Sequence, residues 1–161
     1  MKRTNDNSYL IIIDGQECTG RNTLANWLKL NNENDFIICY FNEDDIYFDV
    51  KELHNKYPEK YIVVPYLFSD EITYHSIDDF EDLFNGNTIT IIMTWDSFID
   101  YEKRMKHLGY KDYDDIEDFN GIKDFYKHLA DKNFYKQINV LAKDTPKDIY
   151  NKVERFFDSI F

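Results

Sequence analysis

The chain has 161 residues, of which 43% are hydrophobic, so it is long enough for one globular domain with a substantial core. Its 31 acidic side chains outnumber its 19 basic ones and give a net charge of −12. Because proteins hold nucleic acids chiefly through clustered Lys and Arg side chains, this balance argues against direct nucleic-acid binding. A small anionic ligand would need a local positive site, whereas the acidic surface serves solubility or resembles the charge of a nucleic acid.

The cysteine content and the absence of long apolar runs bear on the compartment. The chain carries only Cys18 and Cys39, too few for a disulfide framework. It starts with polar residues, and no segment approaches the roughly 18 uninterrupted apolar residues of a membrane helix. We therefore expect a cytoplasmic protein with free thiols and no membrane partner. The four histidines are dispersed and lack the spacing of metal ligands.

Short apolar runs alternate with helical patterns along the chain, which predicts a parallel sheet covered by helices. We expect an α/β fold with three layers, in which helices flank a five-stranded parallel sheet, and a single domain over residues 1–161. The runs that predict strands are Tyr9–Ile13, Phe36–Tyr40, Tyr61–Val64, Thr88–Met93 and Ile138–Leu141.

Four segments have the apolar spacing of helices that cover such a sheet. Gly109 follows the second of them and is suited to end it. The last has Thr145 as its N-cap residue and a proline at its first position, a combination typical of a helix start. The predicted helices are Arg21–Leu30, Asp96–Leu108, Phe119–Lys132 and Pro146–Phe157.

The first predicted strand runs into a segment with the spacing of a phosphate-binding loop. Such a loop has Gly, four residues, Gly, Lys and then Ser or Thr, because glycines admit the phosphates, the Lys neutralises them and the hydroxyl binds Mg²⁺. Gly15 and Gly20 keep this spacing. Arg21 stands in place of the Lys and Asn22 in place of the hydroxyl residue, with Thr23 next to it.

An ordinary strand–turn–helix connection would also favour Gly and Thr at these positions. The orphan amides and dipole at the start of the next helix favour an anion even without the Lys. We therefore interpret the segment as a nucleotide site, with Asn22 and Thr23 as candidate Mg²⁺ ligands. Its candidate binding residues are Gly15, Gln16, Glu17, Cys18, Thr19, Gly20, Arg21, Asn22 and Thr23.

The order of elements resembles the thymidylate kinase and deoxynucleoside kinase group of P-loop kinases. Members open with a strand, an acidic residue and a glycine loop, as Asp14-Gly15 and Glu17 do here. In that group a central strand ends in Asp-Arg, followed by Ser and a Tyr further on. Ser69 and Tyr74 keep this frame, but Pro65-Tyr66 replaces the Asp-Arg pair.

The resemblance also implies a lid over about residues 109–118, with Arg104 as a lid arginine. Leu108 stands one turn on, where a second arginine would be expected. The resemblance places the catalytic base at Glu43, although three consecutive acids after a strand are also typical of a solvated turn. Catalysis would then rest on Arg21, Glu43 and Arg104, with ATP and Mg²⁺ as cofactors, a nucleoside or nucleotide as partner, and a homodimer as in that group.

Two functions are compatible with these residues. The first is a small nucleoside or nucleoside monophosphate kinase that transfers the γ-phosphate of ATP. The second is a non-catalytic descendant of that fold, which binds nucleotide weakly or not at all and works through a protein partner by means of its acidic surface. The departures at Arg21, Asn22, Pro65-Tyr66 and Leu108 all weaken phosphoryl transfer. We therefore expect nucleotide or phosphate binding with weak or lost catalysis.

Overall fold

A five-stranded, all-parallel sheet forms the middle of the molecule, in the order β2-β3-β1-β4-β5. The computed structural model describes residues 8–32, 34–40, 46–65, 77–131, 137–142 and 144–160. The predicted α/β fold with a parallel sheet flanked by helices is confirmed. The strands are β1 (Leu10–Gly15), β2 (Phe36–Ile38), β3 (Tyr61–Pro65), β4 (Thr88–Thr94) and β5 (Gln137–Leu141).

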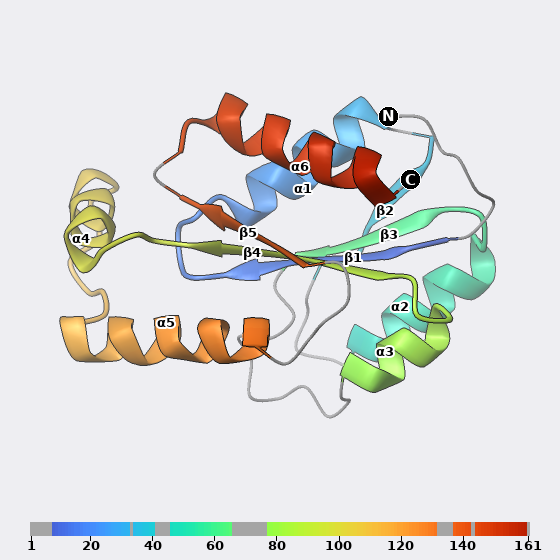
Figure 1. The fold of residues 1–161 in the computed structure, drawn as a ribbon, viewed down its shortest axis with the longest axis horizontal. Coiled ribbons are helices and arrows are strands. Elements are labelled where there is room, and N and C mark those ends of the chain that lie inside the picture. Colours follow the sequence, from blue (N-terminus) through green and yellow to red (C-terminus); the bar gives the residue numbers. More distant parts are fainter. Residues whose placement is uncertain are drawn as a thin grey trace.

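Helices cover both faces of this sheet and so make three layers. Figure 1 shows α1 and α6 on one face, α2, α3 and α5 on the other, and α4 beyond the end of the sheet. Within the described ranges, no helix combines the length and the apolar character that crossing a lipid bilayer requires. The helices are α1 (Arg21–Asn31), α2 (Ile46–Lys56), α3 (Ile77–Leu83), α4 (Phe98–His107), α5 (Ile116–Asp131) and α6 (Pro146–Ile160).

β1 lies at the centre of the sheet because its side chains are apolar on both faces. Ile11 and Ile13 point to the face covered by α1 and α6, where they pack with Leu28 and Phe157. On the other face Leu10 and Ile12 belong to a second cluster, which includes residues of α2 and α3. A strand that is buried on both faces has a continuous run of apolar residues, and this run predicted β1 from the sequence.

Each strand differs from its predicted bounds by one or two residues at an end, and the largest differences are in β1 and β2. β1 continues to Gly15, because Asp14 and Gly15 still pair with Ile92 and Met93 of β4. β2 ends at Ile38 instead of at Tyr40, although the Cys39 amide still donates a hydrogen bond to the Val63 carbonyl at 2.8 Å.

The helix predictions are correct for α1, α4, α5 and α6 within a few residues. The Thr145 hydroxyl accepts a hydrogen bond from the Asp148 amide at 3.2 Å and so caps α6 as predicted. Gly109 has φ +81° and directly follows Leu108, the C-cap residue of α4, which confirms that the helix ends there. α2 and α3 were not predicted. α2 packs on the sheet through the buried Ile46 and Val50 and the partly buried Tyr47 and Leu53.

Candidate functional site

The connection from β1 to α1 lies at the carboxyl edge of the sheet, where parallel α/β proteins bind their ligands. Three of its residues have left-handed backbone angles: Gly15 with φ +139°, Cys18 with φ +56° and Gly20 with φ +93°. A Cβ atom at Gly15 would lie 1.9 Å from the Met93 carbonyl oxygen, so no larger residue fits there. At Gly20 the nearest heavy atom to a Cβ is Met93 Cε at 3.9 Å. Gly15 therefore permits the close contact between β1 and β4, and Gly20 leaves open space above the loop.

The Gln16 and Thr19 side chains hold the loop in shape. The Gln16 amide donates to the Met93 carbonyl at 2.9 Å, and its side-chain oxygen accepts from the Trp95 amide at 2.8 Å. The Thr19 hydroxyl donates to the Gln16 carbonyl at 2.8 Å. Because both side chains are buried and already bonded, Gln16 and Thr19 stabilise the connection between the loop and β4.

Glu17 connects the loop to the segment between α4 and α5. Its carbonyl accepts a hydrogen bond from Trp95 Nε1 at 2.8 Å, and its carboxylate accepts one from the Tyr101 hydroxyl at 3.4 Å. That hydroxyl also accepts from the Asp114 amide at 3.1 Å. Burial raises the pKa of Tyr101 to about 12, and burial followed by the charge of Glu17 raises the pKa of Asp114. The predicted lid segment is therefore bonded to the loop through one tyrosine.

The Arg21 guanidinium bends back onto the loop that precedes it. Its Nη1 donates to the Gly15 carbonyl at 2.7 Å and lies 3.5 Å from Asp14 Oδ1. Asp14 is fully buried, and the same Oδ1 accepts hydrogen bonds from the Gly15 amide at 2.7 Å and the Tyr126 hydroxyl at 2.9 Å. A buried carboxylate is costly unless it is paired in this way. Part of the positive charge of Arg21 is thus directed to Asp14 in this structure.

Two cavities meet above the loop. One of about 380 Å³ is lined by the loop, the start of α1, Tyr40 and Pro65. The other, of about 650 Å³, lies between the loop, α4 and the start of α6. Both are lined by Cys18, Gly20 and Thr23. Each falls within the range of roughly 300–1,000 Å³ that is usual for small-molecule sites.

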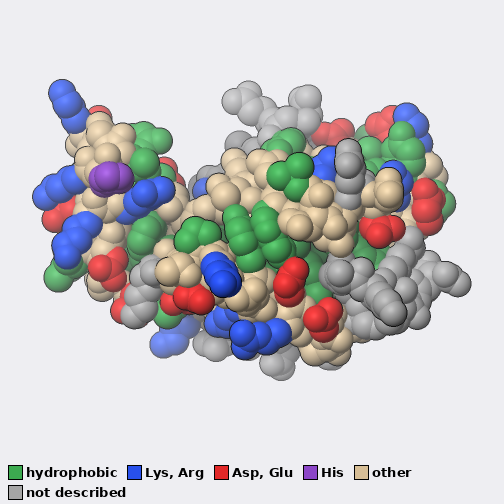
Figure 2. All heavy atoms as spheres, turned by 90° about the horizontal axis from the view of Figure 1, so that it is seen from above, with side chains coloured by type: hydrophobic (Ala, Val, Ile, Leu, Met, Phe, Trp, Pro, Cys, Tyr) green, Lys and Arg blue, Asp and Glu red, His purple; other side chains and the backbone are tan. Residues whose placement is uncertain are grey.

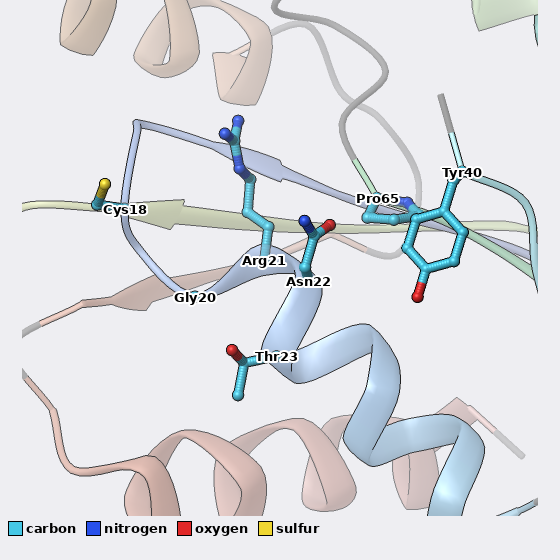
Figure 3. Close-up of a pocket in the computed structure, with 7 residues that line it drawn as sticks. All are labelled: Cys18, Gly20, Arg21, Asn22, Thr23, Tyr40 and Pro65. Atoms are coloured by element: carbon cyan, nitrogen blue, oxygen red, sulfur yellow. The ribbon is translucent and has the colours of Figure 1, made fainter. Parts of the chain in front are cut away.

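The smaller cavity holds the two candidate metal ligands. Figure 3 shows Asn22 and Thr23 on the first turn of α1, with side chains that point in different directions. Among the described residues, its lining contains no carboxylate, and no cluster of three His, Cys, Asp or Glu residues is suited to a metal. Mg²⁺ prefers carboxylate and phosphate oxygens. The residues present therefore fit a Mg²⁺ ion only if the phosphates supply most of its ligands, with Asn22 or Thr23 adding one oxygen.

Basic side chains of α4 line the larger cavity. Lys103, Arg104 and His107 all face it. Figure 2 shows Lys and Arg side chains gathered on the lobe formed by α4, which a hollow separates from the rest of the molecule. Burial and then Glu17 raise the pKa of Cys18, while Arg104 and Arg21 act to lower it. Both arginines thus exert their charge on the centre of the loop from its two sides.

The structure brings together most of the predicted site residues. Arg21 and Arg104 flank the loop, and Asn22 and Thr23 face its cavities. Glu43 and Tyr66 lie outside the described residues. Five further residues of the larger cavity were not predicted from the sequence. The basic residues of α4 and the capped start of α6 were the sequence features that could have indicated them. The five residues are Trp95, Lys103, His107, Asp144 and Tyr150.

No family model matches the chain, and no curated protein matches it in sequence. Solved structures do match. The YorR protein of Bacillus subtilis, in complex with phosphorylated GDP, has a TM-score of 0.67 at 16% identity, over 94% of this chain and 96% of its own. A gluconokinase from Sinorhizobium meliloti has a TM-score of 0.63 at 10% identity, over 94% and 93%. The thymidylate kinase of Ehrlichia chaffeensis has a TM-score of 0.54 at 13% identity, over 94% and 99%.

This chain has the fold of the P-loop kinases. The likeness extends over nearly the whole length of each chain. Identities of 10–16% establish the fold alone. The ligand and the reaction must be argued from the residues of this chain.

Proposed function

We propose that this P-loop kinase-like protein binds a nucleotide and transfers phosphoryl groups weakly or not at all. The observation that carries the proposal is the junction of two cavities at Cys18, Gly20 and Thr23. A nucleotide can lie with its base in the 650 Å³ cavity and its phosphates over this junction. A second molecule in the 380 Å³ cavity would meet the end of its phosphate chain. This is the arrangement that phosphoryl transfer between two molecules needs.

The charges at the junction support an anionic ligand. The first turn of α1 begins at Arg21, so its unpaired amides and the positive end of its dipole lie beside both cavities. α1 has no acidic residue in its first turn that would compete for this position. Arg104 and Lys103 approach from α4. A local positive site of this kind lets a chain with a net charge of −12 hold phosphates.

The same contacts argue for weak catalysis. An ordinary P-loop lysine places a compact charge on the phosphate that is transferred. Here Nη1 of Arg21 is bonded to Gly15 and paired with Asp14, so these two contacts compete with a phosphate for the charge of Arg21. The hydroxyl that would bind Mg²⁺ is replaced by Asn22. Losing one such electrostatic contact typically costs about 10²–10³ in rate, so two losses outweigh what Arg104 retains.

Binding is tested by thermal unfolding with nucleoside di- and triphosphates, with and without Mg²⁺. At 100 times its Kd, a ligand adds about 2.7 kcal/mol of stability, which corresponds to roughly 5–10 °C in Tm for a chain of this size. Gly20 lines both cavities, so G20V fills their junction and should abolish this shift. G86V is the matched control, because Gly86 has a similar φ of +79° and open space around it, away from the cavities. An equal nucleotide shift in G20V and G86V would contradict the proposed site.

Catalysis is tested by a coupled assay of ADP release over the common nucleosides and monophosphates. We expect turnover far below the ~1–100 s⁻¹ of ordinary kinases. R21K should raise it, since a lysine lacks the planar fork that bonds Gly15 while it keeps the charge. Ordinary turnover in the unchanged protein, lost in R21A, would show instead that Arg21 is a working substitute for the lysine.

The second candidate function is partner binding without nucleotide. It is favoured by exposed apolar side chains on α5, among them Ile116, Ile122 and Phe125. Apolar residues on an otherwise acidic surface are suited to a protein partner. An absence of any nucleotide shift, together with unchanged stability in R21A, would favour this function over the first.

A further inference from the structure

We propose that Tyr101 of α4 couples the loop between β1 and α1 to the segment 109–115, so that a nucleotide on the loop also orders that segment. The inference rests on the proposed function, because it concerns regulation of the site that binds the nucleotide. Residues 109–115 belong to the described part of the chain, and none of them lines either cavity. A nucleotide held in these cavities therefore acts on the segment through the residues that connect it to the loop.

The Tyr101 hydroxyl holds the loop and the segment at the same time. It accepts a hydrogen bond from the Asp114 amide at 3.1 Å and lies 3.4 Å from Glu17 Oε2. An amide can only donate, so the hydroxyl oxygen faces Asp114 and the hydroxyl hydrogen is left for the Glu17 carboxylate. Two hydrogen bonds in such a chain polarise and strengthen each other. Fixing Glu17 therefore strengthens the bond to Asp114, and loosening Glu17 weakens it.

The Tyr101 ring is held firmly enough to transmit such a change. It is 1% exposed and belongs to a largely aromatic cluster that is separate from the two clusters on the faces of the sheet. Its centroid lies 5.1 Å from the ring of Phe119 in α5 and 6.1 Å from the ring of Tyr113 in the segment itself. A ring that is packed on several sides has little freedom to turn away when one of its hydrogen-bond partners moves.

The loop contacts the same cluster beside the place where a phosphate would bind. The Glu17 carbonyl accepts a hydrogen bond from Trp95 Nε1 at 2.8 Å, and Cys18 packs against the cluster. Cys18 also lines both cavities. A phosphate on the amides of the loop fixes Cys18 and the peptide before it, which carries the Glu17 side chain. The connection from ligand to segment thus runs through Cys18, Glu17, Tyr101 and Asp114.

Coupling of this kind is reciprocal, which gives it a quantitative signature. If a nucleotide favours the bond between Tyr101 and Asp114 by a given factor, that bond raises the affinity for the nucleotide by the same factor. We expect about 5-fold, the lower end of the usual range, because the contact with Glu17 is long. Y101F removes the hydroxyl and keeps the ring. Y113F is the matched control, since Tyr113 packs against the same cluster but its hydroxyl bonds Glu102 of α4.

The test combines amide hydrogen exchange, followed by NMR, with calorimetric titration of the full chain with ADP, GDP, CDP and UDP. The tightest of the four should slow exchange of the Asp114 amide by about 5-fold relative to the Tyr110 amide, which bonds the Met105 carbonyl at 3.0 Å. Y101F should weaken binding of that nucleotide by the same factor, and Y113F should change neither value. A lower Tm with unchanged affinity in Y101F would make the tyrosine merely structural and would overturn the coupling.

A second variant, E17A, breaks the connection from the loop side. It keeps the hydroxyl that Asp114 bonds, so a lost response cannot come from a missing acceptor. Exchange of the Asp114 amide should no longer respond to the nucleotide in this variant. A nucleotide that binds without slowing Asp114 exchange in the unchanged protein, or a response that persists in E17A, would overturn the coupling and leave the proposed function intact. Binding of none of the four would refute the proposed function, and the coupling with it.

Discussion

The sharpest structural prediction concerns the two loop glycines, which share an unusual backbone conformation but differ in surroundings. Gly15 has φ +139° and Gly20 has φ +93°. An alanine at either position carries the strain of a left-handed residue, about 1–2 kcal/mol. A Cβ atom at Gly20 meets nothing closer than 3.9 Å, whereas one at Gly15 would lie 1.9 Å from the Met93 carbonyl oxygen. Only G15A must therefore force β1 and β4 apart.

The cost of G15A follows from what this separation breaks. The Gln16 amide bonds the same Met93 carbonyl at 2.9 Å, so the shift disrupts a buried hydrogen bond worth about 1–3 kcal/mol. Overpacking a core adds roughly 1–3 kcal/mol more. Together with the shared strain, G15A should lower the free energy of unfolding by at least about 3 kcal/mol, against about 1–2 kcal/mol for G20A.

Urea unfolding followed by tryptophan fluorescence measures this difference, since Trp95 bonds directly to Gln16 and Glu17. With a slope of about 2 kcal/mol per molar urea, G15A should move the midpoint by about 1.5 M or more and G20A by less than about 1 M. Equal midpoints for the two variants would show that the close approach of β1 to β4 at Gly15 does not constrain the loop.

Two further predictions concern the groups around the loop. Y126F removes the hydroxyl that donates to buried Asp14 at 2.9 Å, and should lower the free energy of unfolding by about 1–2 kcal/mol in urea titrations; an unchanged midpoint would contradict this role. D114N should stabilise the protein at neutral pH, because the raised pKa of Asp114 means that folding disfavours its charged form. This advantage should shrink as the pH falls through the raised pKa and vanish below 3.8, the ordinary value of an aspartate. D112N, on the exposed part of the same segment, serves as control, and an equal gain in both variants would count against the burial of Asp114 as the cause.

Much of the fold could be predicted because local signals and burial agree. The apolar run of β1 predicts a strand, and Thr145-Pro146 predicts the start of α6, each from only a few consecutive residues. α2 was not predicted, although Ile46, Val50 and Leu53 have helical spacing, because its stability depends on packing against the sheet. Propensity and period give no information on contacts of that kind.

The site was predictable in position but not in its contacts. Glycine spacing located the loop, and the element order located Arg104. The partners of Gln16 and Asp14 could not be found, because Trp95 and Tyr126 lie far along the chain. Arg21 bonds the nearby Gly15 and Asp14, but the loop motif assigns its charge to a ligand instead. A side chain that the motif assigns to a ligand can be satisfied by the protein itself, and only the folded geometry distinguishes the two. Asp144 was missed for the same reason, since the cavity it lines is assembled from α4, α6 and the loop.

The position of β1 in the sheet also determines how the chain must fold. Leu10 pairs with Ile62 on one side and with Thr88 on the other, so neither neighbour of the central strand is close in sequence. The long segments between these strands must lose conformational entropy before β1 can pair with either neighbour. This cost makes nucleation unfavourable and folding slow. α1 and α6 can begin to form locally, but the apolar faces they present find their partners only when the central strands are paired. The loop between β1 and α1 is therefore among the last parts of the molecule to acquire its shape, because it depends on the registry between β1 and β4.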